Sequence, residues 1–128
     1  MKDATIFIVD DDLSVRRSLA RLLMSAGYDV VACATAEEFL ALDVARPACL
    51  VTDVRMPGMT GLDLLEALRS SGRDLPIILS SGDADAASAA QASARGAFRF
   101  VSKPFEPDEL LGALEEAIDR DRSLIRQR

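Results

Sequence analysis

The sequence predicts an α/β fold, a five-stranded parallel sheet covered by helices on both faces, and three observations support it. Five short apolar segments, at 4–9, 28–33, 48–53, 77–81 and 97–102, are the expected strands. Segments with helical spacing or helical propensity separate them. The chain of 128 residues is long enough for one domain of this size. Strands that alternate with helices form parallel sheets, because each helix returns the chain across the sheet.

The first half of the chain contains three of the strands. The run ATIFIV at 4–9 is apolar and rich in β-branched residues, which is typical of a buried strand. Apolar residues at 15, 19, 22 and 23 then share one face of a helix that ends at Gly27. After strand 28–33, the segment from Thr35 to Glu38 has the pattern of a capping box and opens a short helix. Strand 48–53 follows.

The second half supplies the remaining elements. The loop 54–61 is rich in proline and glycine and is expected to be irregular. Leucines at 62, 65 and 68 mark a helix that precedes strand 77–81. Residues 85–95 are mostly alanine, which favours a helix with few large side chains to anchor it. Beyond strand 97–102, Pro107 occupies the first turn of a last helix with an apolar face.

Composition excludes several classes of function. The chain has no histidine, which rules out Ser-His-Asp and Cys-His catalysis and histidine-rich zinc sites. Cys33 and Cys49 lie in apolar stretches without a CxxC motif, so we expect buried free thiols in a reducing, cytoplasmic setting. The net charge of −6 argues against nucleic-acid binding by this segment. No signal peptide or membrane-spanning run is visible.

Polar side chains of particular types follow four of the five predicted strands. They are Asp10–Asp12, Asp53, Ser81 and Lys103. Ligand sites of open α/β sheets lie at the carboxyl ends of the strands, so these side chains should share one crevice. Lys103 is notable because the chain has 13 arginines but only two lysines, the other being Lys2. A compact ammonium at this point suits a phosphoryl group.

The grouped carboxylates predict a metal site. Without histidine or a thiol cluster, an all-oxygen site favours a hard cation such as Mg²⁺ over Zn²⁺. One carboxylate of such a site can attack phosphorus and form an aspartyl phosphate. Asp12 has a simpler expected role, as the N-cap of the first helix. Ser81 can donate a hydroxyl hydrogen bond to a phosphoryl oxygen, although a serine there is also a common turn residue.

The chain resembles the receiver domain of two-component response regulators over essentially its whole length. The matching motifs are Asp10-Asp11, the stretch DVRMPGMTG from Asp53, Ser81-Gly82 and Lys103-Pro104-Phe105. The stretches DVRMPGMTG and FVSKPFEPDEL are most similar to FixJ-like regulators. The resemblance implies a flavodoxin-like (βα)5 fold with strand order 2-1-3-4-5. It also implies a regulatory phosphoacceptor rather than an enzyme, although one that assists its own phosphorylation and dephosphorylation.

The resemblance implies a role for each matching residue. Asp53 would be the phosphoacceptor, and Mg²⁺ would be held by Asp10, Asp11, Asp53 and the main-chain carbonyl of Arg55. Lys103 would contact the phosphoryl group, next to a cis bond to Pro104. Ser81 would move toward that group and Phe100 would swing inward, although Phe100 can equally be a buried core residue. Arg55 and Asp83 would influence how fast phosphate is lost, unless both are solvated loop charges.

The same resemblance implies partners and a division of the chain. The phosphodonor would be a sensor histidine kinase or a histidine phosphotransfer protein. Phosphorylation would shift helix 85–95, the least protected helix, and drive homodimerisation through the 85–118 face. Residues 1–119 would form the receiver domain, and 120–128 the end of the last helix or the start of a linker. We favour a fragment of a transcription regulator with a DNA-binding helix-turn-helix domain over a stand-alone receiver or phosphorelay intermediate.

Three other functions are compatible with parts of the pattern. In a phosphohydrolase of the haloacid dehalogenase type, Asp10 would be the nucleophile and Asp12 the acid, but no cap segment is evident. A flavodoxin-like cofactor binder should offer amides and hydroxyls in its first loop, where this chain has three carboxylates. A receiver-like domain that works without phosphorylation would not need the complete set of site residues.

Overall fold

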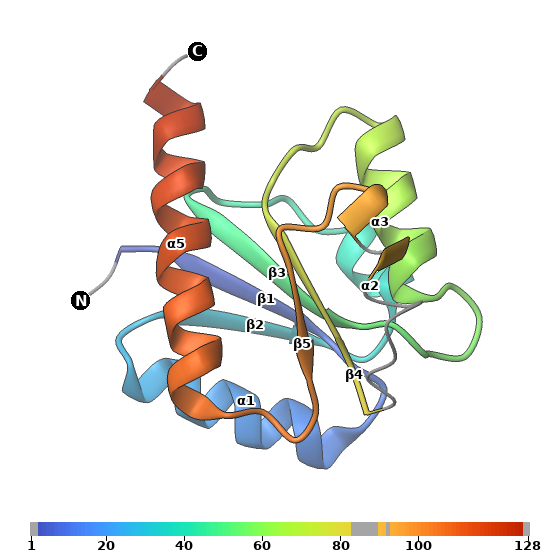
Figure 1. Cartoon of the computed structure of the whole chain (residues 1–128), viewed down its shortest axis with the longest axis horizontal. Helices are drawn as coiled ribbons and strands as arrows, with labels where there is room; N and C mark the ends of the chain where they lie inside the picture. Colours follow the sequence, from blue (N-terminus) through green and yellow to red (C-terminus); the bar gives the residue numbers. More distant parts are fainter. Residues whose placement is uncertain (1–2, 83–89, 92, 127–128) are drawn as a thin grey trace.

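The structure is a computed structural model that describes residues 3–82, 90–91 and 93–126 (Figure 1). Its strands are β1 (Thr5–Val9), β2 (Asp29–Cys33), β3 (Ala48–Asp53), β4 (Ile77–Ser81) and β5 (Arg99–Ser102). Its labelled helices are α1 (Leu13–Ser25), α2 (Ala36–Leu40), α3 (Gly61–Ser70) and α5 (Pro107–Arg126). The strands pair in parallel in the order β2-β1-β3-β4-β5, which confirms the predicted fold class and strand order.

The expected helix at 85–95 lies largely outside the described residues. Residues 90–91 and 93–94 are helical, and a turn at Gly96 (φ +94°) follows them. The fifth strand was predicted to start at Ala97 but starts at Arg99, because Ala97 and Phe98 lead the chain out of that turn. The Phe98 amide donates to the Ile77 carbonyl (2.7 Å) just before the strand begins.

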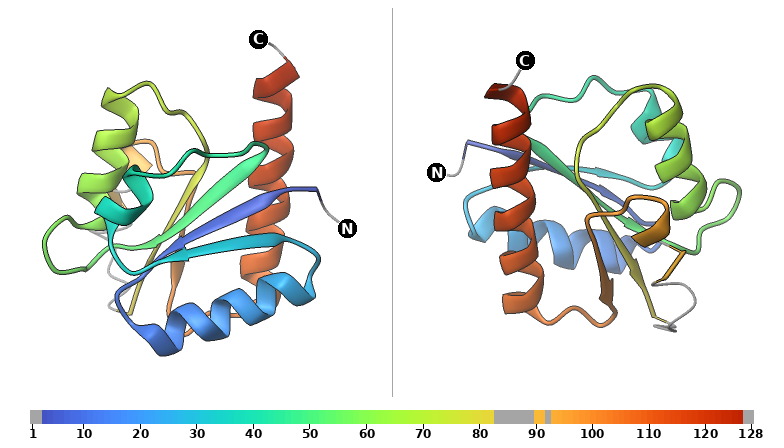
Figure 2. Two further views of the ribbon diagram at one scale, coloured as in Figure 1. Left: turned by 180° about the vertical axis from the view of Figure 1, so that it is seen from behind. Right: turned by 45° about the horizontal axis from the view of Figure 1, so that its top comes forward.

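Helices cover both faces of the sheet (Figure 2). An apolar core lies on each face. Alternate side chains of one strand point to opposite faces, so Phe7 and Val9 join one core while Ile6 and Ile8 join the other. The first core is completed by α2 and α3, and the second by α1 and α5. In the described part of the chain, no helix combines the length and apolar character needed to cross a membrane.

Both cysteines belong to these cores, as the sequence predicts. Cys33 and Cys49 are buried and free. Burial raises the pKa of each thiol, because the thiolate would lose its hydration; nearby acidic side chains raise it further.

We expect the two thiols to be unreactive in the folded protein. Labelling with a water-soluble disulfide reagent at pH 8 should be about a hundredfold slower than in urea, because both thiolate formation and access are suppressed. The reaction can be followed by the absorbance of the released thiolate. Rapid labelling of the native protein would contradict this burial.

The buried carboxylate of Asp121 links the second half of α5 to the sheet. The side chain of Asp121 is fully buried and accepts hydrogen bonds from the Ala48 amide (2.9 Å) and from Arg46 Nε (3.1 Å). A second guanidinium nitrogen of Arg46 also pairs with Asp121, and a third donates to Asp74 at 3.0 Å. Asp121 therefore joins α5 to the start of β3, within the segment predicted as the end of the last helix or the start of a linker.

Replacing Asp121 by asparagine should destabilise the domain by about 3 kcal/mol, because Arg46 would lose its buried anionic partner and keep only the exposed Asp74. Urea unfolding would measure the loss. The matched control is Asp119→Asn on the same helix, where the carboxylate is 78% exposed and lies 3.7 Å from Arg122. The control should change stability by less than about 0.5 kcal/mol, and equal losses in both variants would contradict the assigned role.

Candidate functional site

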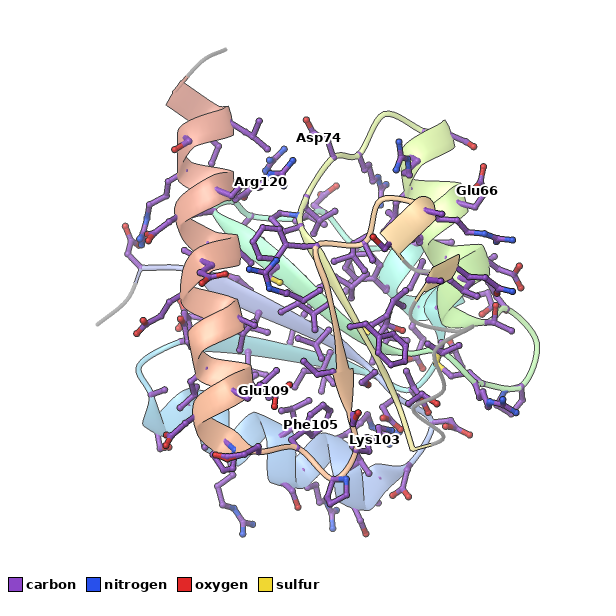
Figure 3. All side chains as sticks on the ribbon, viewed as in Figure 1. Glu66, Asp74, Lys103, Phe105, Glu109 and Arg120 are labelled. Carbon is purple, nitrogen blue, oxygen red and sulfur yellow. The ribbon has the colours of Figure 1, made fainter. Side chains whose placement is uncertain are left out.

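The residues predicted to form the site meet at the carboxyl end of the sheet. Asp10 directly follows β1, and Asp53 ends β3. Because β1 and β3 pair with Val9 opposite Thr52, the next residue of each strand also lies side by side. Figure 3 shows Lys103 beyond β5 at this end of the sheet, whereas Asp74 lies at the opposite end.

Three carboxylates form an acidic cluster at this edge. One oxygen from each of Asp10, Asp11 and Asp53 lies within 4.8 Å of the other two. Asp10 is buried, Asp53 is half-buried and Asp11 is exposed, so the cluster opens to solvent on one side. An all-carboxylate donor set suits a hard divalent cation that retains several water ligands. The residues present thus fit a metal ion, as the sequence predicts.

Lys103 supplies positive charge to two of the carboxylates. Its Nζ lies 2.6 Å from Asp10 Oδ2 and 3.3 Å from Asp53 Oδ2. Burial alone would lower the pKa of Lys103, but its hydrogen bond to Asp10 and the charges of both aspartates raise the pKa above its ordinary value. The ammonium is therefore charged and placed between the two carboxylates.

The environment of Asp53 acts on its pKa in both directions. Burial and the neighbouring charge of Asp10 raise the pKa of Asp53, whereas Lys103 and the amide of Arg55 lower it, with a net upward shift. The Arg55 amide lies 3.4 Å from Asp53 Oδ1. Lys103 opposes the upward shift and so helps to keep Asp53 in the carboxylate form that a nucleophile requires.

Asp12 stands apart from the acidic cluster, as its predicted role implies. Its side chain accepts hydrogen bonds from the amides of Ser14 (2.8 Å) and Val15 (3.2 Å) and caps α1. The Asp12 amide in turn donates to Asp10 Oδ1 at 2.9 Å. This helix-cap role is the one predicted for Asp12, and it differs from the acid role that a dehalogenase-type enzyme would require.

Of the remaining predicted residues, the structure describes Ser81, Phe100 and Pro104. Ser81 is buried at the end of β4, and its carbonyl accepts a hydrogen bond from the Lys103 amide (3.0 Å). Phe100 is half-buried and packs against the core that contains α3. The Lys103–Pro104 peptide bond is cis. Asp83 lies outside the described residues.

Two further residues that the sequence did not assign to the site contact its main chain. Gly61, at the start of α3, approaches Asp53 so closely that a Cβ built on it would lie 2.3 Å from the Asp53 carbonyl oxygen. Arg16, near the start of α1, donates from Nη1 to the Asp10 carbonyl oxygen at 2.7 Å. The GMTG pattern contains Gly61, but only the folded path of the chain shows why a side chain is excluded there.

A groove adjoins the site on the α1 side. Its volume is about 580 Å³, and most of its lining is apolar. The lining comes from the first turns of α1 and from the segment after β5, namely Ser14, Val15, Ser18, Leu19, Leu22, Lys103, Pro104 and Phe105. Lys103 therefore faces both the acidic cluster and this groove.

Comparison with known protein families identifies the chain. The model of the response regulator receiver domain matches residues 6–115. The chain belongs to this family. Its site residues all lie within the matched segment, and this assignment makes the chain a regulatory domain rather than a dedicated enzyme.

Relatives and solved structures support the same assignment. The receiver domain is similar to nodulation protein W of Bradyrhizobium diazoefficiens, with 43% identity over 120 residues, which are 93% of this chain and 53% of that protein. It is also 43% identical over 122 residues to the transcriptional regulatory protein TdiR of Thauera aromatica, covering 94% of this chain and 54% of that protein. The chain thus spans about half the length of these relatives.

The same fold is found in the crystal structure of FixJ-N. The two chains superpose with a TM-score of 0.86 and 42% sequence identity, over 93% of this chain and 96% of the other. This likeness confirms the predicted resemblance to FixJ-like receiver domains.

Replacing Gly61 by alanine should displace the Asp53 main chain, because the new methyl group would overlap the Asp53 carbonyl. We expect a loss of about 1–3 kcal/mol of stability in thermal unfolding. The control Gly112→Ala adds the same methyl group on an exposed position of α5 with no atom within 4 Å. The control should gain up to about 1 kcal/mol, since alanine is the better helix former.

Proposed function

We propose that this receiver domain is a phosphorylation switch in which Asp53 accepts a phosphoryl group from a phosphohistidine. The donor would be a sensor histidine kinase or a histidine phosphotransfer protein, since this chain contains no histidine. The observation that carries the proposal is the convergence of Asp10, Asp11 and Asp53 around one ammonium, that of Lys103. Buried free thiols fit a cytoplasmic location.

The chain's own groups would perform the transfer. An Asp53 carboxylate oxygen attacks phosphorus, the bond between phosphorus and the donor imidazole nitrogen breaks, and the imidazole leaves with the bonding electron pair. Asp10, Asp11, Asp53 and the main-chain carbonyl of Arg55 would hold Mg²⁺, which supplies charge neutralisation for the phosphoryl oxygens. The nucleophile and the carboxylates that would hold the metal lie at the ends of neighbouring strands, so little reorganisation would be needed during transfer.

Lys103 would exchange one anionic partner for another during the reaction. It contacts Asp10 and Asp53 in the absence of phosphate. A phosphoryl group on Asp53 brings three acceptor oxygens and a charge of about −1.5 to −2. The Lys103 ammonium would then donate a hydrogen bond to a phosphoryl oxygen. Only a small movement would be needed, because the ammonium is compact and already lies close to Asp53.

The change at Lys103 would be transmitted to β4 and β5. The Lys103 amide and the Ser81 carbonyl are hydrogen-bonded at 3.0 Å, so the ends of these two strands move together. Ser81 would donate its hydroxyl to the phosphoryl group, and Phe100, three residues before Lys103, would swing further into the core it already contacts. Helix 85–95 and the face from 85 to 118 would shift as a result and favour a homodimer.

The groove between α1 and the segment after β5 would receive the phosphodonor. Apolar contacts from Val15 and Phe105 can hold a partner helix beside Lys103, next to the phosphoacceptor. Arg55 and Asp83, two positions beyond Asp53 and Ser81, would set the lifetime of the phosphorylated state by restricting the approach of water.

The output would be transcription, through an effector domain joined to this one. The relatives include a transcriptional regulatory protein, and the matched segment is about half of it. A helix-turn-helix domain in the remaining half would bind DNA, whereas this acidic domain would not. A stand-alone receiver or phosphorelay intermediate is the alternative organisation, and the chemistry at Asp53 would be the same.

Asp53→Asn should abolish phosphorylation, because the amide cannot attack phosphorus and carries no charge. We expect labelled acetyl phosphate to phosphorylate the wild type in the presence of Mg²⁺ and to leave Asp53→Asn unlabelled. The matched control is Asp29→Asn, an exposed carboxylate at the other end of the sheet, which should be labelled like the wild type.

Mapping the labelled residue separates the rival functions. Label on Asp53 supports the switch, and removal of Mg²⁺ by a chelator should abolish it. Label on Asp10 would instead support a phosphohydrolase of the haloacid dehalogenase type. A wild type that takes up no label under these conditions would contradict the proposed switch.

A further inference from the structure

The carbonyl group of Asp10 is bonded by a side chain of α1 rather than by the sheet. Arg16 Nη1 donates to this oxygen at 2.7 Å, and the Arg16 side chain is half-buried. The last residue of β1 that pairs with its neighbours is Val9, opposite Cys33 and Thr52. Asp10 therefore lies just beyond the strand pairing, where its carbonyl needs another donor, and Arg16 supplies one.

The other polar atoms of Asp10 are bonded as well. Its amide donates to the Cys33 carbonyl (3.2 Å), and its carboxylate accepts from the Asp12 amide (2.9 Å) and from Lys103 Nζ (2.6 Å). Two cations thus bond this residue, one at its carboxylate and one at its main-chain carbonyl. Lys103 bonds the carboxylate, which a metal would also bind, whereas Arg16 bonds the main chain and leaves the carboxylate oxygens to other partners.

We propose that Arg16 is a positioning residue for the metal site. The hydrogen bond from Arg16 fixes the main chain at Asp10, and this sets the direction in which the side chains of Asp10 and Asp11 point beyond β1. Their carboxylates therefore stay close to the carboxylate of Asp53. This inference rests on the proposed function, because it takes these aspartates as ligands of a divalent cation. Groups that orient metal ligands commonly change metal affinity 10–100-fold when they are removed.

The sign of the effect distinguishes positioning from simple electrostatics. Arg16 is a cation beside a cation site, so removal of its charge alone should strengthen metal binding. Loss of a positioning bond should weaken it instead. Arg17 offers a matched control, because it is the adjacent residue on α1, has the same charge and is exposed to solvent, where salt screens its field.

The experiment measures Mn²⁺ binding to the whole domain by electron paramagnetic resonance, without a phosphodonor. The variants are Arg16→Gln, Arg16→Lys and Arg17→Gln. We expect Mn²⁺ binding about tenfold weaker in Arg16→Gln and a smaller loss in Arg16→Lys, which keeps the charge but not the planar fork of donors. Arg17→Gln should bind within about twofold of the wild type or slightly more tightly.

Several outcomes would overturn the inference. Unchanged or tighter Mn²⁺ binding in Arg16→Gln would show that the side chain acts only through its charge or not at all. A lower melting temperature with unchanged Mn²⁺ affinity would show a merely structural role. If Arg16→Gln does not fold, Arg16→Lys decides the question, and Mn²⁺ affinity equal to that of the wild type would overturn the inference.

The same measurements separate this inference from the proposed function. A wild type that binds no Mn²⁺ would overturn both, since the aspartates would then form no metal site. Normal Mn²⁺ binding in the wild type together with undiminished binding in Arg16→Gln would overturn the role of Arg16 alone. A wild type that binds Mn²⁺ but is not phosphorylated on Asp53 would overturn the switch. In that case, weaker Mn²⁺ binding by Arg16→Gln would still support the positioning role of Arg16.

Discussion

Mutual repulsion among three carboxylates is the constraint on which the functional end of this domain depends. Like charges within 4.8 Å of one another disfavour the folded state unless positive charge or hydrogen bonds compensate them. Here the compensation comes from separate parts of the chain: Lys103 from the segment after β5, the Asp12 amide from the loop after β1, and the Arg55 amide after β3. A divalent cation would complete it, which explains why an acidic cluster can persist at the edge of a stable sheet.

The pairing of parallel strands places the mutually repelling carboxylates at defined positions. Strand pairing fixes Asp10 beside Asp53, and the two apolar cores pack against the strands on both faces of the sheet. The stabilising apolar burial lies behind the site, while the charged groups lie beyond the strand ends where solvent and ions have access. The apolar middle of each strand thus stabilises the fold, and the residues at its carboxyl end form the site. The carboxyl edge of the sheet can therefore be polar while the interior is apolar.

Features that depend on local pattern were predictable from the sequence, whereas features that depend on distant partners were not. Apolar runs located the strands, and Asp12 was predicted as a helix cap because a cap bonds residues two or three positions away. Asp121 lies in the segment predicted only as a helix end or the start of a linker, yet it is buried because Arg46, 75 residues away, faces it. Arg16 was not assigned to the site for the same reason, since its contact depends on how the loop returns to α1.

The close approach of Gly61 to Asp53 couples the start of α3 to the main chain at the functional edge of the sheet. Because α3 begins in contact with the Asp53 main chain, and the Gly61 amide donates to the Val54 carbonyl at 2.9 Å, the start of α3 and the end of β3 are joined directly. On the other side of Asp53, a main-chain hydrogen bond joins the end of β4 to Lys103. The end of β4 is joined to β3 as well, because the Val54 amide donates to the Ser80 carbonyl at 2.8 Å, so a displacement of the Asp53 main chain would reach both α3 and the β4–β5 side.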